Sequence, residues 1–289
     1  MTQCDEKVMT NIAYLGPEGS FSHIAAYLHV ADRDEQSGGL LKPSKSIREV
    51  FEAVENGDCC VGIVPYENSL AGNIAETLEG FDRYQVTIIG EIYVPVNHVL
   101  MANTKLTDGN VVHQVYSKYE VFGQCHEWLE KNLFEAKHIS CASTADAARL
   151  ASADANGVAI GSQLAARHFK MDIIEYNLSG DASNFTRFLV ITPDYKQTPD
   201  CTLDDKTTMR FSVPHEPGSL VEVLKIFCDL NVNLTHLALV PKSLSPMSRA
   251  FFVDFSGHIS QHSELLFALQ QTGVEFAILG SYPRAEDLL

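Results

Sequence analysis

The run Asn184-Phe185-Thr186-Arg187-Phe188 puts a hydroxyl group next to a guanidinium group at the start of an apolar, β-branched stretch. The Thr186 hydroxyl can donate a proton to a departing oxygen, and the Arg187 guanidinium is a planar, permanently charged group suited to carboxylates. Because a Thr-Arg pair where a strand begins is usually ordinary surface, the run alone is weak evidence of a site. Polar segments earlier in the chain strengthen the case for a site at this run.

Small polar residues recur upstream wherever a predicted strand ends and a helix begins. They lie at 16–22, at Glu67-Asn68-Ser69, at Ser117, at Ser143-Thr144 and at Ser162. Helix N-termini expose backbone N–H groups and carry about half a positive charge, so several around one crevice can hold an anion. Each hydroxyl taken alone is explained as well by a helix cap, worth about 1 kcal/mol.

Length and charge limit the possible functions. The 289 residues suit two domains better than one, and 45% of them are hydrophobic, which is enough for a sizeable core. The net charge is −16, with 21 Lys and Arg against 37 Asp and Glu, so neither nucleic acid nor an anionic membrane is an expected partner. An anionic substrate would have to be held by local dipoles or a single arginine.

Other motifs point away from disulfides, metals and organic cofactors. The seven cysteines include the adjacent Cys59-Cys60 but form no C-x-x-C, which is typical of reduced thiols in a cytoplasmic protein. The eleven histidines show no metal-ligand spacing, Gly16-x-x-Gly19 is not a dinucleotide fingerprint, and no nucleophile elbow occurs. No secretory signal or membrane-spanning run is visible.

Short apolar runs alternate with helical patterns through the first two thirds of the chain. The clearest helix is predicted over 46–56, where Ser46 and Glu49 form a capping box. Strands are predicted at 11–15, 60–64, 86–94, 111–116, 138–141 and 158–160, a loop at 65–69, and helices at 22–30, 75–81, 122–133 and after Ser143 and Ser162. This alternation favours a parallel sheet with helices on both faces.

The last third of the chain has a different residue pattern. Residues 192–206 contain prolines and acidic residues without periodicity and are predicted to form a linker. Strand, helix, strand, strand, helix and strand then follow at 207–213, 218–230, 234–240, 250–255, 261–272 and 275–280. This order is the ferredoxin-like plan, and such a module usually binds or regulates.

Taken in order, five segments resemble the motifs of prephenate dehydratases, and the resemblance spans nearly the whole chain. The segments are Gly16-Pro17-Glu18-Gly19-Ser20-Phe21-Ser22, Val64-Pro65-Tyr66-Glu67-Asn68-Ser69 with Gly72, Tyr116-Ser117 through Gln124-Cys125, Ser143-Thr144-Ala145, and Asn184-Phe185-Thr186-Arg187-Phe188. In the third segment, Lys118-Tyr119 stands where the family commonly has His-Pro. Five motifs in the right order are far more specific than one.

The resemblance implies a fold of the α/β class. It implies a two-lobed, periplasmic-binding-protein-like (type II) catalytic domain over 9–193, a linker over 194–205, and a ferredoxin-like βαββαβ ACT domain over 206–284. It also implies a monofunctional enzyme without a fused chorismate mutase, and a homodimer or homotetramer.

The ACT resemblance also bears on regulation, since the family binds L-phenylalanine between subunits. Gly218, Ser219, Leu220 and Val221 resemble the family's G-A-L-V motif and would contact the regulatory ligand. The second motif, E-S-R-P, falls at Ala238-Leu239-Val240-Pro241, where only the proline remains. We therefore expect weak or absent inhibition by phenylalanine.

The reaction implied by the resemblance converts prephenate to phenylpyruvate, water and carbon dioxide without a metal or organic cofactor. The resemblance assigns Thr186 to the leaving hydroxyl, with Asn68, Ser117 and Gln124 orienting the substrate. Arg187 either anchors a carboxylate or braces Thr186, and side-chain alternation along a strand favours bracing. Supporting residues are expected to be Glu67, Ser69, Ser20, Ser143, Thr144, Arg187 and Phe188.

Three alternatives stay open from the sequence. Arogenate dehydratase performs the same chemistry on an amino-acid side chain. A non-catalytic small-anion sensor could share the catalytic fold, although the retained Thr186, Asn68, Ser117 and Gln124 argue against it. A non-aromatising prephenate decarboxylase is also related, but such relatives usually lack the ACT tail that this chain resembles.

Overall fold

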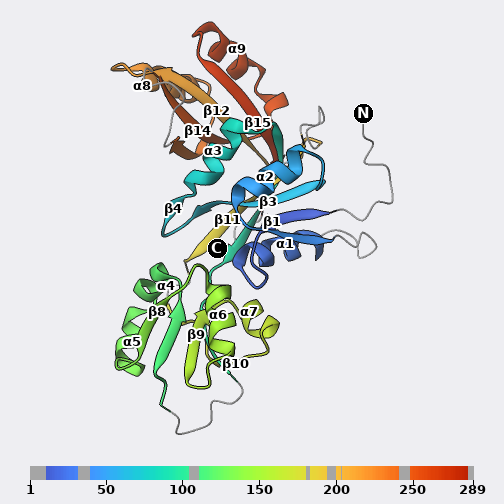
Figure 1. The fold of residues 1–289 in the computed structure, drawn as a ribbon. Coiled ribbons are helices and arrows are strands. Elements are labelled where there is room, and N and C mark those ends of the chain that lie inside the picture. Colours follow the sequence, from blue (N-terminus) through green and yellow to red (C-terminus); the bar gives the residue numbers. More distant parts are fainter. Residues whose placement is uncertain are drawn as a thin grey trace.

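The computed structural model describes residues 11–31, 40–103, 111–179, 183–193, 200–202, 204–240 and 248–285. These residues form three sheets of mixed α/β structure, stacked one above another in Figure 1. We call the unit around the first sheet the first lobe, that around the second sheet the second lobe, and that around the third sheet the C-terminal unit.

The first lobe contains a six-stranded sheet in the order β2-β1-β3-β11-β5, with β4 paired to β3. Its strands are β1 (Ile12–Leu15), β2 (Leu41–Ser44), β3 (Val61–Asn68), β4 (Gly72–Asn73), β5 (Val86–Pro95) and β11 (Phe185–Pro193), and its helices are α1 (Phe21–Ala31), α2 (Ile47–Glu55) and α3 (Ala75–Arg83). Helix α1 packs on one face of this sheet, and α2 and α3 pack on the other.

The second lobe contains a five-stranded sheet in the order β10-β6-β9-β7-β8. Its strands are β6 (Val99–Ala102), β7 (Gln114–Ser117), β8 (Lys137–Ser140), β9 (Gly157–Gly161) and β10 (Asp172–Glu175), and its helices are α4 (Tyr119–Gln124), α5 (His126–Asn132), α6 (Thr144–Ser152) and α7 (Gln163–His168). The chain enters this lobe between β5 and β6 and returns between β10 and β11. Two crossings therefore join the lobes.

The C-terminal unit contains a four-stranded antiparallel sheet in the order β13-β14-β12-β15. Its elements are β12 (Asp205–Pro214), α8 (Ser219–Asp229), β13 (Leu234–Leu239), β14 (Ser248–Ser256), the short 3-10 helix η1 (Ile259–Gln261), α9 (Ser263–Gln271) and β15 (Glu275–Pro283). The predicted order of strand, helix, strand, strand, helix and strand is confirmed.

The predicted N-cap at Ser46 is also confirmed, but Glu49 returns its hydrogen bond one residue further back than a capping box has it. Ser46 lies at the N-cap of α2, and its hydroxyl accepts a hydrogen bond from the Glu49 backbone N–H at 3.2 Å. The Glu49 carboxylate accepts from the backbone N–H of Lys45 at 2.8 Å, one residue before the cap. The buried face of α2 consists of Ile47, Val50, Phe51 and Val54.

Some predictions of local structure are wrong. Residues 65–69 do not form a loop up to Asn68, because β3 continues to that residue. Pro65 has no backbone N–H and cannot donate a hydrogen bond to the neighbouring strand. The register of the pairing with β11 shifts at this point, between Arg187 and Phe188, and this irregularity accommodates the proline. The helix predicted over 122–133 is two helices, α4 and α5, that meet at Cys125.

The sheets of the first and second lobes are mixed, not parallel as predicted. Strand β11 runs antiparallel to both β3 and β5, and β6 runs antiparallel to β9. The linker prediction over 192–206 is too long, because β11 extends to Pro193 and β12 begins at Asp205, while 194–199 and 203 lie outside the described residues. The strands β2, β4, β6 and β10 were not predicted; all are four residues or shorter.

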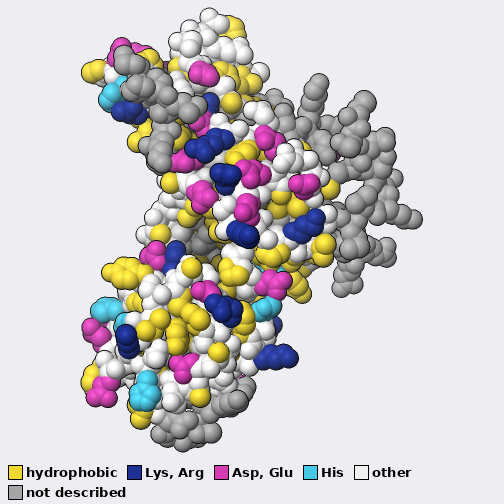
Figure 2. Space-filling view, in the orientation of Figure 1, with side chains coloured by type: hydrophobic (Ala, Val, Ile, Leu, Met, Phe, Trp, Pro, Cys, Tyr) yellow, Lys and Arg dark blue, Asp and Glu magenta, His cyan; other side chains and the backbone are white. Residues whose placement is uncertain are grey.

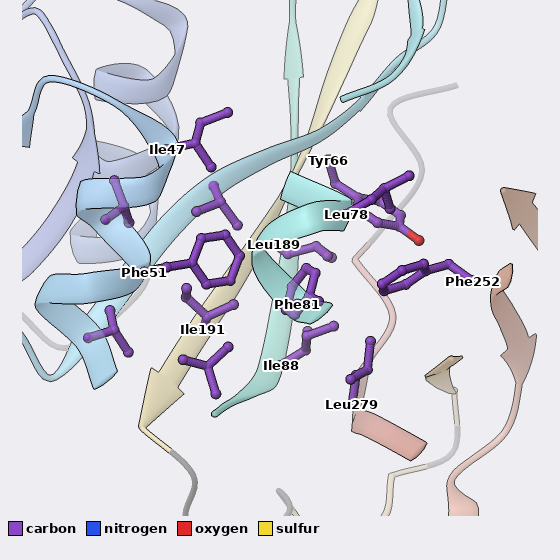
Figure 3. Packing of buried hydrophobic residues seen from close by; sticks show 14 of the residues in the cluster. Ile47, Phe51, Tyr66, Leu78, Phe81, Ile88, Leu189, Ile191, Phe252 and Leu279 are labelled. Atoms are coloured by element: carbon purple, nitrogen blue, oxygen red, sulfur yellow. The ribbon is translucent and has the colours of Figure 1, made fainter. Parts of the chain in front are cut away.

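One hydrophobic core is shared by the first lobe and the C-terminal unit. Phe51, Phe81 and Leu189 of the first lobe belong to the same buried cluster as Phe252 and Leu279 of the C-terminal unit (Figure 3). The Phe81 and Phe252 rings lie 6.0 Å apart between centroids. Strand β15 packs against β5 so closely that a methyl group on Gly280 would overlap the Ile88 carbonyl.

Candidate active site

The end of β3 and the start of β11 lie side by side. Asn68 pairs with Thr186 in the antiparallel ladder. The Asn68 amide nitrogen donates to Asn184 Oδ1 at 3.0 Å, the Phe185 carbonyl at 2.9 Å and Thr186 Oγ1 at 3.1 Å. Its amide oxygen accepts from the backbone N–H groups of Leu70 and Ala71, which fixes the amide orientation.

These contacts determine what the Thr186 hydroxyl can do. Its oxygen accepts from Asn68, so its own proton stays available for another acceptor. The side chain is half-buried, so the hydroxyl is partly sheltered from water. Neighbouring Ser69 strengthens the junction, because its hydroxyl donates to the Ser183 carbonyl at 2.9 Å and accepts from the Phe185 N–H at 3.0 Å.

Asn184 carries a polar atom that the fold leaves unpaired. The side chain is 1% exposed, and within the described residues its amide nitrogen has no hydrogen-bond partner. An unsatisfied buried donor costs about 1–3 kcal/mol. The Asn184 carbonyl accepts from Val96 N–H at 2.8 Å, so this residue lies where both crossings between the lobes meet.

Arg187 points to the opposite face of the strand from Thr186 and is 2% exposed. Its Nε donates to Glu91 Oε2 at 2.7 Å, its Nη1 to Asp254 Oδ2 at 2.5 Å and its Nη2 to Tyr282 Oη at 3.0 Å. Each guanidinium nitrogen thus has a partner inside the protein.

Further contacts complete this buried polar network. Lys206 Nζ donates to both oxygens of Glu91 at 2.9 Å, and the Thr208 hydroxyl donates to Asp254 Oδ1 at 2.7 Å. Burial, together with the nearby Arg187 charge, lowers the pKa of Lys206. The network joins β5 and β11 of the first lobe to β12, β14 and β15 of the C-terminal unit.

Glu67 faces a second junction with the C-terminal unit. Its carboxylate lies 3.8 Å from Nε2 of His236, a residue of β13. The same histidine is 2.7 Å from Asn73 Oδ1 through Nε2 and 3.2 Å from Tyr66 Oη through Nδ1. Burial lowers the pKa of His236, although the Asp254 and Glu67 carboxylates oppose that shift.

Ser117 and Gln124 belong to the second lobe. The Ser117 side chain is fully buried at the end of β7, and its hydroxyl donates to the Ile160 carbonyl at 2.9 Å. Gln124 ends α4 and is half-buried, with its amide oxygen 3.1 Å from Nε2 of His98. No hydrogen bond connects either residue to Asn68 or Thr186 within the described residues, so their contact with a substrate stays a prediction.

The remaining predicted support residues stabilise helix starts or the core. The Ser20 hydroxyl accepts from the His23 N–H at 3.2 Å, and Ser143 caps α6 by accepting from the Asp146 N–H at 3.0 Å. Thr144 is the first residue of α6 and is 9% exposed, while Phe188 is buried among the first-lobe core residues.

The two lobes touch near Ser20. The Ser162 hydroxyl of the second lobe donates to the Gly19 carbonyl at 2.5 Å. Gly19 has φ +85° and lies against Ala165, where a Cβ would be only 2.9 Å from the Ala165 Cα atom. Figure 2 shows the surface indented between the lobes on the side where β4 and α4 lie in Figure 1.

The predicted regulatory residues lie at the start of α8. Gly218 caps this helix with φ 93°, Leu220 packs on the core of the C-terminal unit, and Val221 is 65% exposed. Ser219 is half-buried. Pro241, the residue kept from the second motif, lies outside the described residues.

Sequence reasoning missed several polar residues of this region. Glu91, Asp254 and Tyr282 bind Arg187, and His98 binds Gln124. Glu91 offered a signal, because an acidic residue inside a β-rich apolar run requires a partner when buried.

No helix within the described ranges is long and apolar enough to cross a membrane.

Comparisons with known proteins agree with these features. The sequence profile of the family described as prephenate dehydratase matches residues 12–196. A bifunctional chorismate mutase/prephenate dehydratase of Aquifex aeolicus is 35% identical over 277 residues, covering 95% of this chain and 74% of that protein.

Two solved structures are similar over nearly the whole chain. The prephenate dehydratase of Arthrobacter aurescens in complex with L-Phe has a TM-score of 0.84 at 26% identity, covering 96% of this chain and 91% of that chain. GqqA, described as a novel type of quorum quenching acylase, has a TM-score of 0.80 at 24% identity, covering 96% of this chain and 98% of that chain, and this likeness concerns the fold alone. By its profile match and its sequence relatives, the chain belongs to the prephenate dehydratase family.

Proposed function

We propose that this protein catalyses the decarboxylating dehydration of prephenate to phenylpyruvate in L-phenylalanine biosynthesis. The observation that carries the proposal is the Asn68–Thr186 hydrogen bond in a chain whose family is prephenate dehydratase. That bond occupies the Thr186 oxygen and leaves its proton for the substrate.

The proposed chemistry needs one proton and no redox partner. The bond between the ring and its carboxylate breaks, carbon dioxide leaves, and the electron pair enters the ring. The ring then expels the hydroxyl group, which takes up one proton and departs as water. A free threonine hydroxyl is a weak acid, so Thr186 acts chiefly by donating a hydrogen bond to the departing oxygen.

The other residues of the junction hold Thr186 in position. Asn68 fixes the Thr186 rotamer from β3, and Ser69 fixes the backbone of Phe185. Arg187 serves as a brace in this proposal, since its three nitrogens bind Glu91, Asp254 and Tyr282. The substrate carboxylates are then held by neutral donors and helix N-termini, which suits an acidic protein.

The domain organisation forms part of the proposal. The first and second lobes correspond to a periplasmic-binding-protein-like catalytic domain over 9–193, followed by a linker and an ACT-like domain over 206–284. The two crossings between the lobes and the antiparallel four-stranded C-terminal sheet support this reading. A homodimer or homotetramer and a cytoplasmic location are further expectations from the family.

We also propose that the response to L-phenylalanine is altered or lost. Leu239 and Val240 stand where the family motif has a hydroxyl and a guanidinium, so these two side chains cannot supply the polar contacts that the motif would make with an amino acid. Titration with L-phenylalanine during turnover tests this point. Strong inhibition, with tight binding by calorimetry, would refute the proposed loss.

The function itself is tested by incubating the protein with prephenate and following phenylpyruvate by its absorbance in alkali. Turnover of prephenate is the expected result. A parallel assay with arogenate decides between the two dehydratases, and product analysis detects a non-aromatising decarboxylase. Binding of prephenate without any turnover would support a small-anion sensor instead.

A further inference from the structure

His98 occupies the first crossing between the lobes and contacts both of them. It is 2% exposed, and its ring meets the Phe21 ring of the first lobe edge-on, with centroids 5.6 Å apart. On the other side, its Nε2 atom lies 3.1 Å from Oε1 of Gln124, at the end of α4 in the second lobe. Its backbone carbonyl accepts from the Leu178 N–H.

The hydrogen bond between His98 and Gln124 has a direction. The ring is neutral near pH 7, because burial lowers the pKa of His98 and outweighs the opposing hydrogen bond to Gln124. Either Nε2–H donates to the amide oxygen, or the amide NH2 group donates to Nε2 and a proton sits on Nδ1. Nδ1 is buried without a partner in the described part of the chain.

The buried Nδ1 atom decides between these arrangements. Orphaned buried N–H groups are rarer in proteins than unsatisfied acceptors. A proton on Nδ1 would create such a group, whereas a proton on Nε2 leaves Nδ1 as an acceptor. His98 therefore donates from Nε2, and the Gln124 oxygen is the atom that it holds.

The other end of the Gln124 amide is then free. Its NH2 group makes no hydrogen bond to a described residue, and it is not among the buried side-chain atoms that lack a partner. The half-buried side chain therefore leaves this group exposed to solvent. An amide group that could rotate would present its oxygen and its nitrogen alternately, but the hydrogen bond with His98 permits only one of the two orientations.

We propose that His98 is a positioning residue, which holds the Gln124 amide so that its NH2 group donates to a carboxylate of the substrate. This rests on the proposed function, because prephenate carries two carboxylates and no positive group. A carboxylate would be repelled by the amide oxygen. The direction of the amide therefore decides whether Gln124 attracts or repels the substrate.

Four variants test the proposal by steady-state kinetics with prephenate. His98→Leu keeps the apolar packing but lets the Gln124 amide rotate. The KM for prephenate should then rise about tenfold, which corresponds to the loss of roughly one charge-assisted hydrogen bond, while kcat should change less than about threefold. His98→Gln places an amide near the original Nε2 position and should bring KM back to within about threefold. His98→Asn is too short to reach Gln124 and should resemble His98→Leu. Gln124→Met removes the donor and should also raise KM at least tenfold.

A double-mutant cycle separates positioning from general stability. In the Gln124→Met background, His98→Leu should change KM less than about twofold, because the residue through which His98 acts is gone. His138→Leu is the matched control. The His138 ring of β8 stacks on Phe122 of α4, the helix that carries Gln124, with ring centroids 4.6 Å apart, and its loss should leave KM unchanged.

Opposite results overturn the proposal. If His98→Leu and His98→Asn keep the wild-type KM, or if the KM effect persists undiminished in the Gln124→Met background, His98 does not act through Gln124. If His98→Leu fails to fold, the comparison of His98→Gln with His98→Asn decides. A wild-type protein that makes no phenylpyruvate from prephenate refutes the proposed function itself, whereas turnover with insensitive variants refutes only the role of His98.

Discussion

Arg187 of β11 donates a hydrogen bond of 2.5 Å to Asp254 of β14, across the boundary between the first lobe and the C-terminal unit. Because Thr186 precedes Arg187 in the same strand, the candidate catalytic hydroxyl sits one residue from a bond to another unit. The position of Thr186 therefore depends on packing that its own lobe does not supply.

Replacing Thr186 tests its proposed chemical role. Thr186→Ala should lower kcat about 100- to 1,000-fold, the usual effect of removing one donor to a developing oxyanion. Thr186→Ser keeps the hydroxyl and should recover much of this loss. Thermal unfolding of both variants should stay close to that of the wild type, since the side chain is only half-buried. A kcat near the wild-type value in folded Thr186→Ala would remove the assigned role.

Arg187→Met should destabilise the protein by about 3–5 kcal/mol, since it removes one partner from a buried network of charges. Glu91 would keep Lys206, but Asp254 would lose its guanidinium partner. Urea unfolding monitored by circular dichroism measures the change. Arg48→Met is the control, because the exposed Arg48–Glu52 pair should contribute less than about 1 kcal/mol. Equal effects from both variants would contradict the importance of the network.

Gly280→Ala should destabilise the contact between β15 and β5. A methyl group there would overlap the backbone of Ile88, which cannot move away as a flexible side chain could. We expect a loss of about 1–3 kcal/mol in the free energy of unfolding. Gly90→Ala lies in the same strand as Ile88, with its nearest neighbour atom at 3.6 Å, and should be close to neutral. An unchanged melting temperature for Gly280→Ala would contradict this prediction, because the contact would then accept a methyl group without cost.

Stability should fall as the pH drops below about 6.5. Burial lowers the pKa of His23 and of His98 from their ordinary value of 6.5, so the unfolded chain binds more protons than the folded one in this range. The associated stability is present above pH 6.5 and is lost as the pH falls through the folded-state pKa values. Denaturant unfolding between pH 5.5 and 7.5 should show this decline, and His98→Gln should make it shallower. An equally steep decline in the variant would exclude His98 as a contributor.

The sequence was most informative where a local signal matched the final structure. Ser46 and Glu49 located the start of α2, because capping depends on residues only three apart. The order of elements in the C-terminal unit was also readable, since each strand and helix there has its own apolar pattern. Asn68 and Thr186 were both identified as candidate residues, but only the ladder between β3 and β11 places their side chains 3.1 Å apart.

What the sequence could not supply were relationships across long distances. Strand β11 inserts between β3 and β5, so the sheet is mixed although the local pattern indicated a parallel one. His98 lies in a short crossing without periodicity, and nothing near it in the chain indicates Gln124. The buried partners of Arg187 come from β5, β14 and β15, which are 67 to 96 residues away along the chain.

The shared core in Figure 3 bears on how such proteins can be recombined. Phe81 and Leu78 of α3 pack in one cluster with Phe252 and Leu279, so cutting the chain near residue 200 would expose a broad apolar surface on both pieces. A fragment without the C-terminal unit should therefore aggregate when expressed alone. A chimera that borrows a C-terminal unit from a relative would need matching substitutions in α3, because the two regions must fit each other as one packed interior.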